Sequence, residues 1–148
     1  VEEYMDGRGF TVLAAARKNK KSCRVFKPVE YAFPEGKSFK TYSLKTSELH
    51  PDCNFPCTDP ALDKELSAAT EKIFKGFNGV GYARVDFRVN DKNEIIFLEI
   101  NFTCSVFYTD GYEGSADFIL KFDEAGQKGF LEHIIDEGIA RYRRKKKT

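Results

Sequence analysis

The 148-residue chain lacks the features that mark several protein classes. It contains no run of about 18 apolar residues, so no transmembrane helix is predicted. Lys and Arg total 24 against 23 Asp and Glu, and the formal net charge of +1 lacks the positive excess that nucleic-acid phosphates require. Its four cysteines are too sparse for a disulfide-dense scaffold. We therefore expect a protein that binds neither membranes nor nucleic acid.

Two local features run against these absences. The ending RYRRKKKT, residues 141–148, is strongly basic; it is typical of a solvated helix end, and a targeting or anionic-surface role is the less favoured alternative. His50, Cys53 and Cys57 lie close in sequence and resemble a set of zinc ligands. Free thiols in a loop are the favoured interpretation, with a Cys53–Cys57 disulfide or a metal as alternatives.

The remaining composition is that of a folded protein. Hydrophobic residues make up 41% and aromatic residues 14%, which is enough for a real core. The length fits one domain or part of a larger one. The chain begins VEEYMDGRGF without an initiator Met, which indicates a piece of a longer protein.

Strand patterns dominate the first third of the chain. Residues 2–5 are expected to end a strand, and strands are predicted at 10–17 and 24–33. A short strand at 41–45 and a long polar loop at 46–58 are expected to follow.

Helical patterns follow. Asp59 is a good N-cap and Pro60 suits the first helical position, so a helix is predicted to begin there and to end at a left-handed cap at Asn78-Gly79. Two more helices are predicted at 115–121 and 128–144. The predicted buried faces are Leu62, Leu66, Ala69, Ile73 and Phe77 in the first helix, and Phe130, Leu131, Ile134, Ile135 and Ile139 in the last.

The stretch ARVDFRVNDKNEIIFLEINFT, residues 83–103, predicts an antiparallel hairpin around a turn at 90–93. Pairing Val89 with Glu94 makes one face almost wholly apolar and gathers the charges on the other. In this register Arg84 is opposite Glu99, and Asp86 lies diagonally from it.

The polar face of this hairpin suits a metal. Asp86, Glu99 and Asn101 present oxygen ligands of the kind that Mg²⁺ prefers, and Arg84 beside them could neutralise developing negative charge. The alternative is an amphipathic hairpin with a surface ion pair worth under about 1 kcal/mol.

The ordered motifs GYARVDFRV, FLEIN, GYEGSADFIL and GFLEHII resemble the C-terminal part of D-alanine–D-alanine ligases, within the ATP-grasp superfamily. VEEYMDGRGFTVL and PVEYAFPEGKSFKTYSLKT resemble the segments before them, so the resemblance spans nearly all of the chain. It implies an α+β fold over residues 1–148: the C-terminal lobe of an ATP-grasp domain, with a mostly antiparallel sheet and helices packed on one face. The preceding domains would lie outside this sequence.

The resemblance also implies an activity. Such ligases phosphorylate a carboxylate with ATP and Mg²⁺ (or Mn²⁺), and an amine then attacks the acyl phosphate. It makes Asp86, Glu99 and Asn101 the metal ligands, and it makes Arg84 and Lys45 catalytic, with Lys45 reaching the γ-phosphate. Its other implied site residues are Glu2, Glu3, Tyr4 and Met5 for adenine and, more weakly, Ser115 for the substrate carboxylate; an N-cap role is the alternative for Ser115.

By the same resemblance, the partners are ATP and amino-acid-like substrates, the location is cytoplasmic, and a homodimer is compatible. Two departures stand out. Gly9 occupies the position of the family's ribose-binding Glu, and residues 102–105 replace the usual N-x-x-P-G continuation. Phe102 and Cys104 would then lie where the second substrate binds. A ligase is favoured over a non-catalytic nucleotide-binding module and over a plain interaction domain; the piece alone is expected to be inactive.

Overall fold

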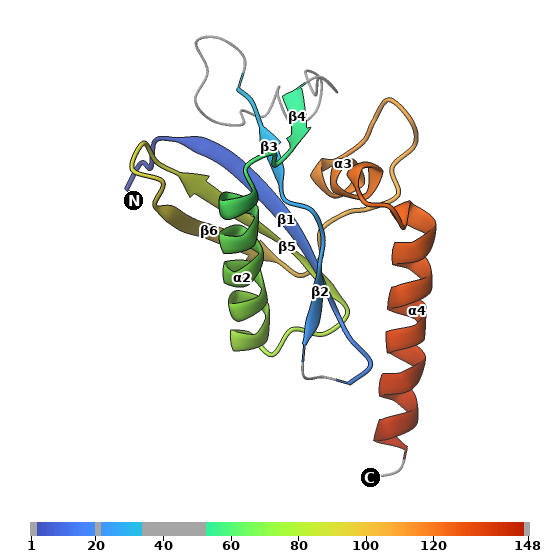
Figure 1. Ribbon diagram of the computed structural model, residues 1–148. Helices are drawn as coiled ribbons and strands as arrows, with labels where there is room; N and C mark the ends of the chain where they lie inside the picture. The colour runs from blue at the N-terminus through green and yellow to red at the C-terminus, as the bar shows by residue number, and fades with distance from the viewer. Residues whose placement is uncertain (1–2, 20–21, 34–52, 147–148) are drawn as a thin grey trace.

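The computed structural model describes residues 3–19, 22–33 and 53–146, which form one antiparallel sheet and three helices (Figure 1). The strand order is β4-β3-β1-β5-β6, and β2 pairs with the far end of β1. The α+β class and the antiparallel sheet are confirmed. The strands are β1 (Arg8–Ala16), β2 (Cys23–Val25), β3 (Val29–Tyr31), β4 (Asn54–Pro56), β5 (Tyr82–Val89) and β6 (Ile95–Asn101); the helices are α2 (Pro60–Gly76), α3 (Ser115–Phe122) and α4 (Gly126–Lys145).

Strand β1 is the centre of the sheet. Residues 10–16 are all buried, and β1 pairs with β5 on one side and with β2 and β3 on the other. Because side chains alternate, Phe10 and Val12 pack with the α2 residues Leu62 and Leu66. Leu13 and Ala15, which point to the opposite face of β1, pack with α3 and α4. The helix residues in this second cluster are Ala116, Ile119, Leu120 and Phe130.

The helices therefore cover both faces of the sheet, which corrects the expectation of one covered face. The physical reason lies in β1, which is apolar at nearly every position after Gly9 and needs cover on both sides. In Figure 1, α2 crosses in front of β1 and β5, while α3 and α4 lie to one side.

The strand predictions need three corrections. The stretch 24–33 forms two short strands, β2 and β3, separated at residues 26–28, where Pro28 cannot donate a ladder hydrogen bond. Residues 54–56, expected in a loop, form β4 against β3. Residues 3–7 are not a strand. The expected strand at 41–45 lies outside the described residues.

Helix α2 begins as predicted. Oδ1 of Asp59 accepts hydrogen bonds from the backbone N–H groups of Ala61 at 2.9 Å and Leu62 at 3.2 Å. Asn78 has φ 53°, as expected of a left-handed cap. The buried face is shifted from the predicted one: Phe77 is 59% exposed, and the buried residues are Leu62, Leu66, Thr70 and Phe74.

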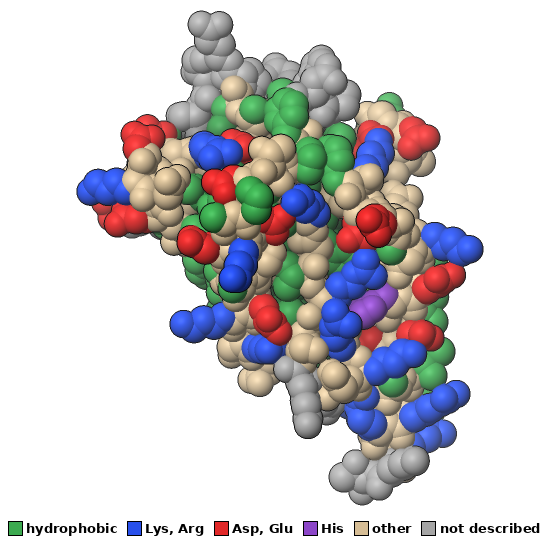
Figure 2. Space-filling model, in the orientation of Figure 1, with side chains coloured by type: hydrophobic (Ala, Val, Ile, Leu, Met, Phe, Trp, Pro, Cys, Tyr) green, Lys and Arg blue, Asp and Glu red, His purple; other side chains and the backbone are tan. Residues whose placement is uncertain are grey.

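Helix α4 buries less than its pattern predicts. Phe130 is fully buried, but Leu131, Ile135 and Ile139 are 43–51% exposed, so the prediction for those three is wrong. Ile134 is partly buried and packs against the core cluster. Glu137 is also buried, at 2% exposed, and its Oε1 lies 3.5 Å from Nε of Arg141. Basic side chains gather along the lower half of α4 (Figure 2), where cations suit the helix dipole. Within the described ranges, no helix is long and apolar enough to cross a membrane.

Replacing the N-cap tests the start of α2. Asp59→Ala removes the acceptor of two backbone N–H groups, so we expect the free energy of unfolding to fall by about 1 kcal/mol. Denaturant unfolding measures the change. Glu65→Ala, an exposed position on the same helix, is the control and should shift the value by less than about 0.5 kcal/mol. Equal effects of the two variants would contradict the capping role.

Candidate functional site

The β5–β6 hairpin holds the candidate site, and its register differs from the predicted one. Near the turn, Val89 pairs with Ile95 and Phe87 with Phe97. The register then shifts between Asp86 and Phe87, so that Asp86 pairs with Glu99. Beyond the shift, Arg84 pairs with Asn101. The prediction that Arg84 is opposite Glu99 is therefore wrong.

The shift is a β-bulge that absorbs Leu98, and it keeps the charges together. If the turn-side register continued unchanged, Glu99 would face Val85 on the buried side, and burying an unpaired carboxylate costs several kcal/mol. With the bulge, Ile100 faces Val85 instead. Bulges often re-aim side chains beside active sites. The predicted shared polar face is thus present, although the pairing within it is different.

Four predicted site residues meet on this face. Nε of Arg84 donates to Oδ1 of Asp86 at 3.0 Å, and Nη2 donates to Oδ2 at 2.8 Å. The same Nη2 lies 3.5 Å from Oε1 of Glu99. The Oδ1 of Asn101, opposite Arg84, accepts from the backbone N–H of Thr103 at 2.9 Å. Arg84 therefore contacts Asp86 and Glu99 directly, and Asn101 lies beside them, opposite Arg84 in the ladder.

Charge pairing dominates this cluster. Burial by itself lowers the pKa of Arg84, but Asp86 and Glu99 oppose that effect and the net pKa is raised, so the guanidinium stays charged. The Glu99 side chain is 63% exposed and the Asp86 side chain 22%. One carboxylate is thus anchored in the sheet and the other reaches into solvent.

The donor set fits a hard cation. Two carboxylates and one amide supply oxygen ligands, which suit Mg²⁺ bound together with phosphate oxygens. Across residues 3–19, 22–33 and 53–146, no group of three or more His, Cys, Asp or Glu side chains is arranged to hold a metal. A metal here would therefore need Asn101 or oxygens from a bound substrate besides the two carboxylates.

One residue beside the cluster is not among the predicted site residues. Thr11, on β1, pairs with Asp86, and its hydroxyl donates to Oδ1 of Asp86 at 2.7 Å. It is the one hydroxyl residue in the buried run FTVLAAA, residues 10–16, and that isolation is a signal available in the sequence.

The remaining predicted site residues lie on other segments or outside the described ranges. Glu2 and Lys45 are outside the described residues. Glu3, Tyr4 and Met5 precede β1, and Met5 is six residues before Thr11, a separation of at most about 21 Å along the chain. Ser115 is the first residue of α3, and the N-cap is Gly114, so the alternative N-cap role of Ser115 is wrong.

Gly9 occupies the position where the family resemblance expects a ribose-binding Glu, and the residues around it limit the space for such a side chain. A Cβ built there would lie 3.3 Å from the ring of Phe33. The guanidinium of Arg88 stacks over that ring at 4.6 Å and donates to the carbonyl of Gly7 at 2.7 Å. An aromatic ring therefore stands close to where a larger side chain at position 9 would begin.

Phe102 and Cys104 are packing residues. The ring of Phe102 lies 6.2 Å from the rings of Phe74 and Phe77, which places it beside α2. Cys104 is 2% exposed and belongs to the cluster containing Leu13. Cys104 also lies close enough to Arg84 for the two to affect each other's pKa. The expectation that Phe102 and Cys104 lie where a second substrate binds stays a prediction.

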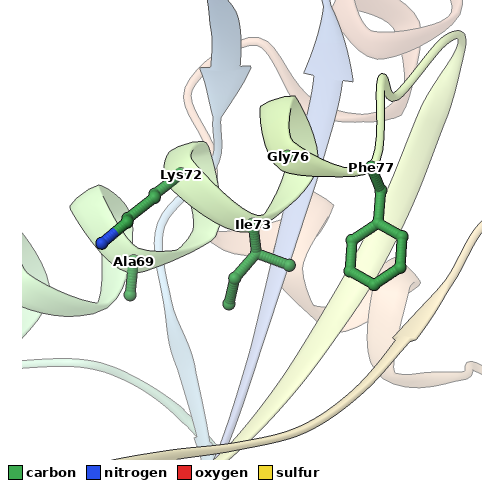
Figure 3. Close-up of a pocket in the computed structure, with 5 residues that line it drawn as sticks. All are labelled: Ala69, Lys72, Ile73, Gly76 and Phe77. Carbon is green, nitrogen blue, oxygen red and sulfur yellow. The ribbon is translucent and has the colours of Figure 1, made fainter.

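A shallow hollow of about 450 Å³ lies elsewhere, along the end of α2. Figure 3 shows Ile73 and Phe77 pointing into it from the helix. Ala69, Lys72 and Gly76 complete its lining, which contains no carboxylate. The hollow thus lacks the acidic ligands of the hairpin cluster, and the cluster is the better candidate for phosphate or metal chemistry.

Comparison with known proteins gives a consistent family. The family model described as "D-ala D-ala ligase C-terminus" matches residues 1–108. A D-alanine–D-alanine ligase of Vesicomyosocius okutanii subsp. Calyptogena okutanii (strain HA) is 33% identical over 101 residues, which are 68% of this chain and 32% of that protein. The chain therefore spans about a third of the curated relative that it matches.

Solved structures support the fold. The D-alanine–D-alanine ligase of Coxiella burnetii matches with a TM-score of 0.68 and 17% identity, over 99% of this chain and 35% of that one. The ligase of Bacillus anthracis complexed with ATP has a TM-score of 0.64 and 19% identity, over 99% of this chain and 42% of that one. At these identities the likeness concerns the fold, which extends through α3 and α4.

The thiols offer a test of the packing around the site. The four cysteines are free, and burial raises the pKa of Cys23, Cys57 and Cys104, so less thiolate is present at a given pH. We expect iodoacetamide at pH 7.5 to modify the half-buried Cys53 first and the other three slowly, with faster modification as the pH rises. Peptide mass spectrometry follows each site. Native Cys104 reacting as fast as Cys53 would contradict its burial.

Proposed function

This chain belongs to the D-alanine–D-alanine ligase C-terminal family, and we propose that it forms the C-terminal lobe of an ATP-binding, Mg²⁺-dependent carboxylate–amine ligase. The observation that carries the proposal is the convergence of Arg84, Asp86, Glu99 and Asn101 on one face of the β5–β6 hairpin. The family resemblance assigns site roles to these same four residues, and the β-bulge keeps their side chains on one face of the hairpin.

The cation ligands are Asp86, Glu99 and Asn101. Asp86 lies in the sheet beside Thr11, which suits a fixed ligand. The exposed Glu99 side chain suits a ligand that meets the cation as nucleotide arrives. Bound Mg²⁺ supplies charge neutralisation to the phosphates of ATP.

Arg84 is the catalytic cation. In the first step a substrate carboxylate oxygen attacks the γ-phosphorus, the bond from that phosphorus to the bridging oxygen breaks, and ADP leaves. In the second step an amine attacks the acyl carbon, phosphate departs, and the amine loses a proton. Both steps develop negative charge on oxygen, which a fixed guanidinium stabilises.

The other residues take their roles from the resemblance. Lys45 contacts the γ-phosphate, and Glu2, Glu3, Tyr4 and Met5 hold the adenine. Ser115, at the start of α3, contacts a substrate carboxylate. The N-terminal and central parts of the ligase lie in the preceding chain, without which this lobe is inactive. The ligase acts on amino-acid-like substrates, and a homodimer is compatible with the family resemblance.

A second candidate function is a non-catalytic nucleotide-binding module. The observation that favours it is Gly9, where the family resemblance expects a ribose-binding Glu. The ring of Phe33 lies 3.3 Å from a Cβ built at Gly9, so restoring that carboxylate would require the ring to move. Such a module would bind nucleotide without turning it over.

Binding tests the metal ligands. Asp86→Asn and Glu99→Gln should each weaken Mg²⁺-dependent ATP binding by at least about tenfold, because a contact to a charged group contributes about 1.5–3 kcal/mol. Calorimetry on the protein at its natural length measures this. The matched control is Asp91→Asn, at the exposed turn of the same hairpin. Affinity unchanged in both site variants would exclude the proposed metal site.

Turnover separates the two candidate functions. A ligase should release phosphate from ATP when a carboxylate substrate and an amine substrate are both supplied, and Arg84→Met should abolish that release while leaving the fold intact. Phosphate release is measured over a panel of D- and L-amino acids. Tight Mg²⁺–ATP binding with no release for any member of the panel would favour the non-catalytic module.

A further inference from the structure

The buried hydroxyl of Thr11 calls for a physical explanation. Thr11 is 4% exposed, and the other six residues of 10–16 in β1 are all apolar. Valine has nearly the same shape and would bury more favourably, because an unsatisfied hydroxyl in a core costs about 1–3 kcal/mol. The hydroxyl is therefore expected to have a partner that matters.

Its partner is one of the proposed metal ligands. Thr11 lies directly opposite Asp86 in the β1–β5 ladder, and its Oγ1 donates to Oδ1 at 2.7 Å. That length is typical of a hydroxyl bound to a charged carboxylate. The β-branched side chain is also stiff at χ1, so the hydroxyl is held in place by the strand itself.

The second partner of Asp86 is of a different kind. Arg84 contacts both oxygens of Asp86, but its Nη2 also lies 3.5 Å from Glu99. A guanidinium shared between two carboxylates can turn from one to the other or toward an arriving phosphate. When Arg84 turns away, Thr11 still donates to Oδ1 of Asp86, and Oδ2 becomes available to bind a cation.

We propose that Thr11 is a positioning residue that holds Asp86 in its metal-binding orientation through the hydrogen bond to Oδ1. The inference rests on the proposed function, because it requires Asp86 to be a metal ligand. Thr11 itself does not touch the metal. Residues that orient a ligand in this way commonly change metal affinity by about 10–100-fold when they are removed.

The experiment compares two substitutions at the same position. Thr11→Val removes the hydroxyl with little change in shape, and we expect the affinity for Mg²⁺ in the presence of saturating ATP to fall by about 10–100-fold. Thr11→Ser keeps the hydroxyl and should restore most of the affinity. Calorimetric titration of Mg²⁺ into the nucleotide-bound protein, at its natural length, gives the values. ATP binding without metal should change little in either variant.

A second buried threonine provides the matched control. Thr70, on α2, is fully buried, and within the described residues its Oγ1 has no hydrogen-bond partner. Thr70→Val should therefore leave Mg²⁺ affinity unchanged. Thermal unfolding of every variant checks folding; if Thr11→Val fails to fold, Thr11→Ala replaces it, with the same expected loss of affinity.

A double-mutant cycle separates failure of the inference from failure of the proposed function. Thr11→Val should add little to the loss caused by Asp86→Asn, because both act through one ligand. If Asp86→Asn weakens Mg²⁺ binding and Thr11→Val does not, the role of Thr11 is excluded while the metal site stands. Equal losses in Thr11→Val and Thr11→Ser would indicate packing alone and overturn the inference. If Asp86→Asn has no effect, the metal site fails, and the role of Thr11 fails with it.

Discussion

The antiparallel hydrogen bonding of β1 to β5 is the constraint on which both the sheet and the polar cluster depend. The ladder runs from Arg8–Val89 to Ala15–Tyr82 and fixes which side chains of the two strands share a face. One face receives α2, and the other receives α3 and α4. The same alternation places Thr11 and Asp86 together on the second face. The core and the candidate site are thus two outcomes of one register.

The sequence could predict that Arg84, Asp86 and Glu99 share one face of the hairpin, but not the pairing. The predicted register put Ile95 and Phe97 on the polar face, whereas they pair with Val89 and Phe87 on the apolar face. Alternation of charged and apolar residues requires Arg84, Asp86 and Glu99 to avoid the core, and the structure meets that requirement. The pattern contains one residue too many for a regular ladder. Nothing local in the sequence says where the surplus is absorbed, because a bulge is decided by packing of Phe97 on Phe87 and of Ile100 on Val85.

Helix ends were predictable because they depend on neighbouring residues, whereas buried faces depend on contacts with distant parts of the chain. The Asp59 cap and the left-handed Asn78 depend on hydrogen bonds within a few residues, which the sequence states directly. Burial depends on where a helix lands. Phe77 lies just after the end of α2, and Ile135 lies on the solvent side of α4, so both are exposed. The filling of the space beside Gly9 likewise comes from a distant residue, Phe33.

Because the bulge at Leu98 accommodates one extra residue, β6 should tolerate the loss of one residue during evolution. Deleting Leu98 would leave Phe97 opposite Phe87 and Glu99 opposite Asp86 in an uninterrupted ladder, so the polar cluster would survive the loss. An extra residue inserted between Phe97 and Glu99 would exceed what the single bulge accommodates. It would place Glu99 opposite Val85 unless a second bulge formed. Length variation in this strand should therefore be tolerated in one direction only, with shortening accepted and lengthening selected against.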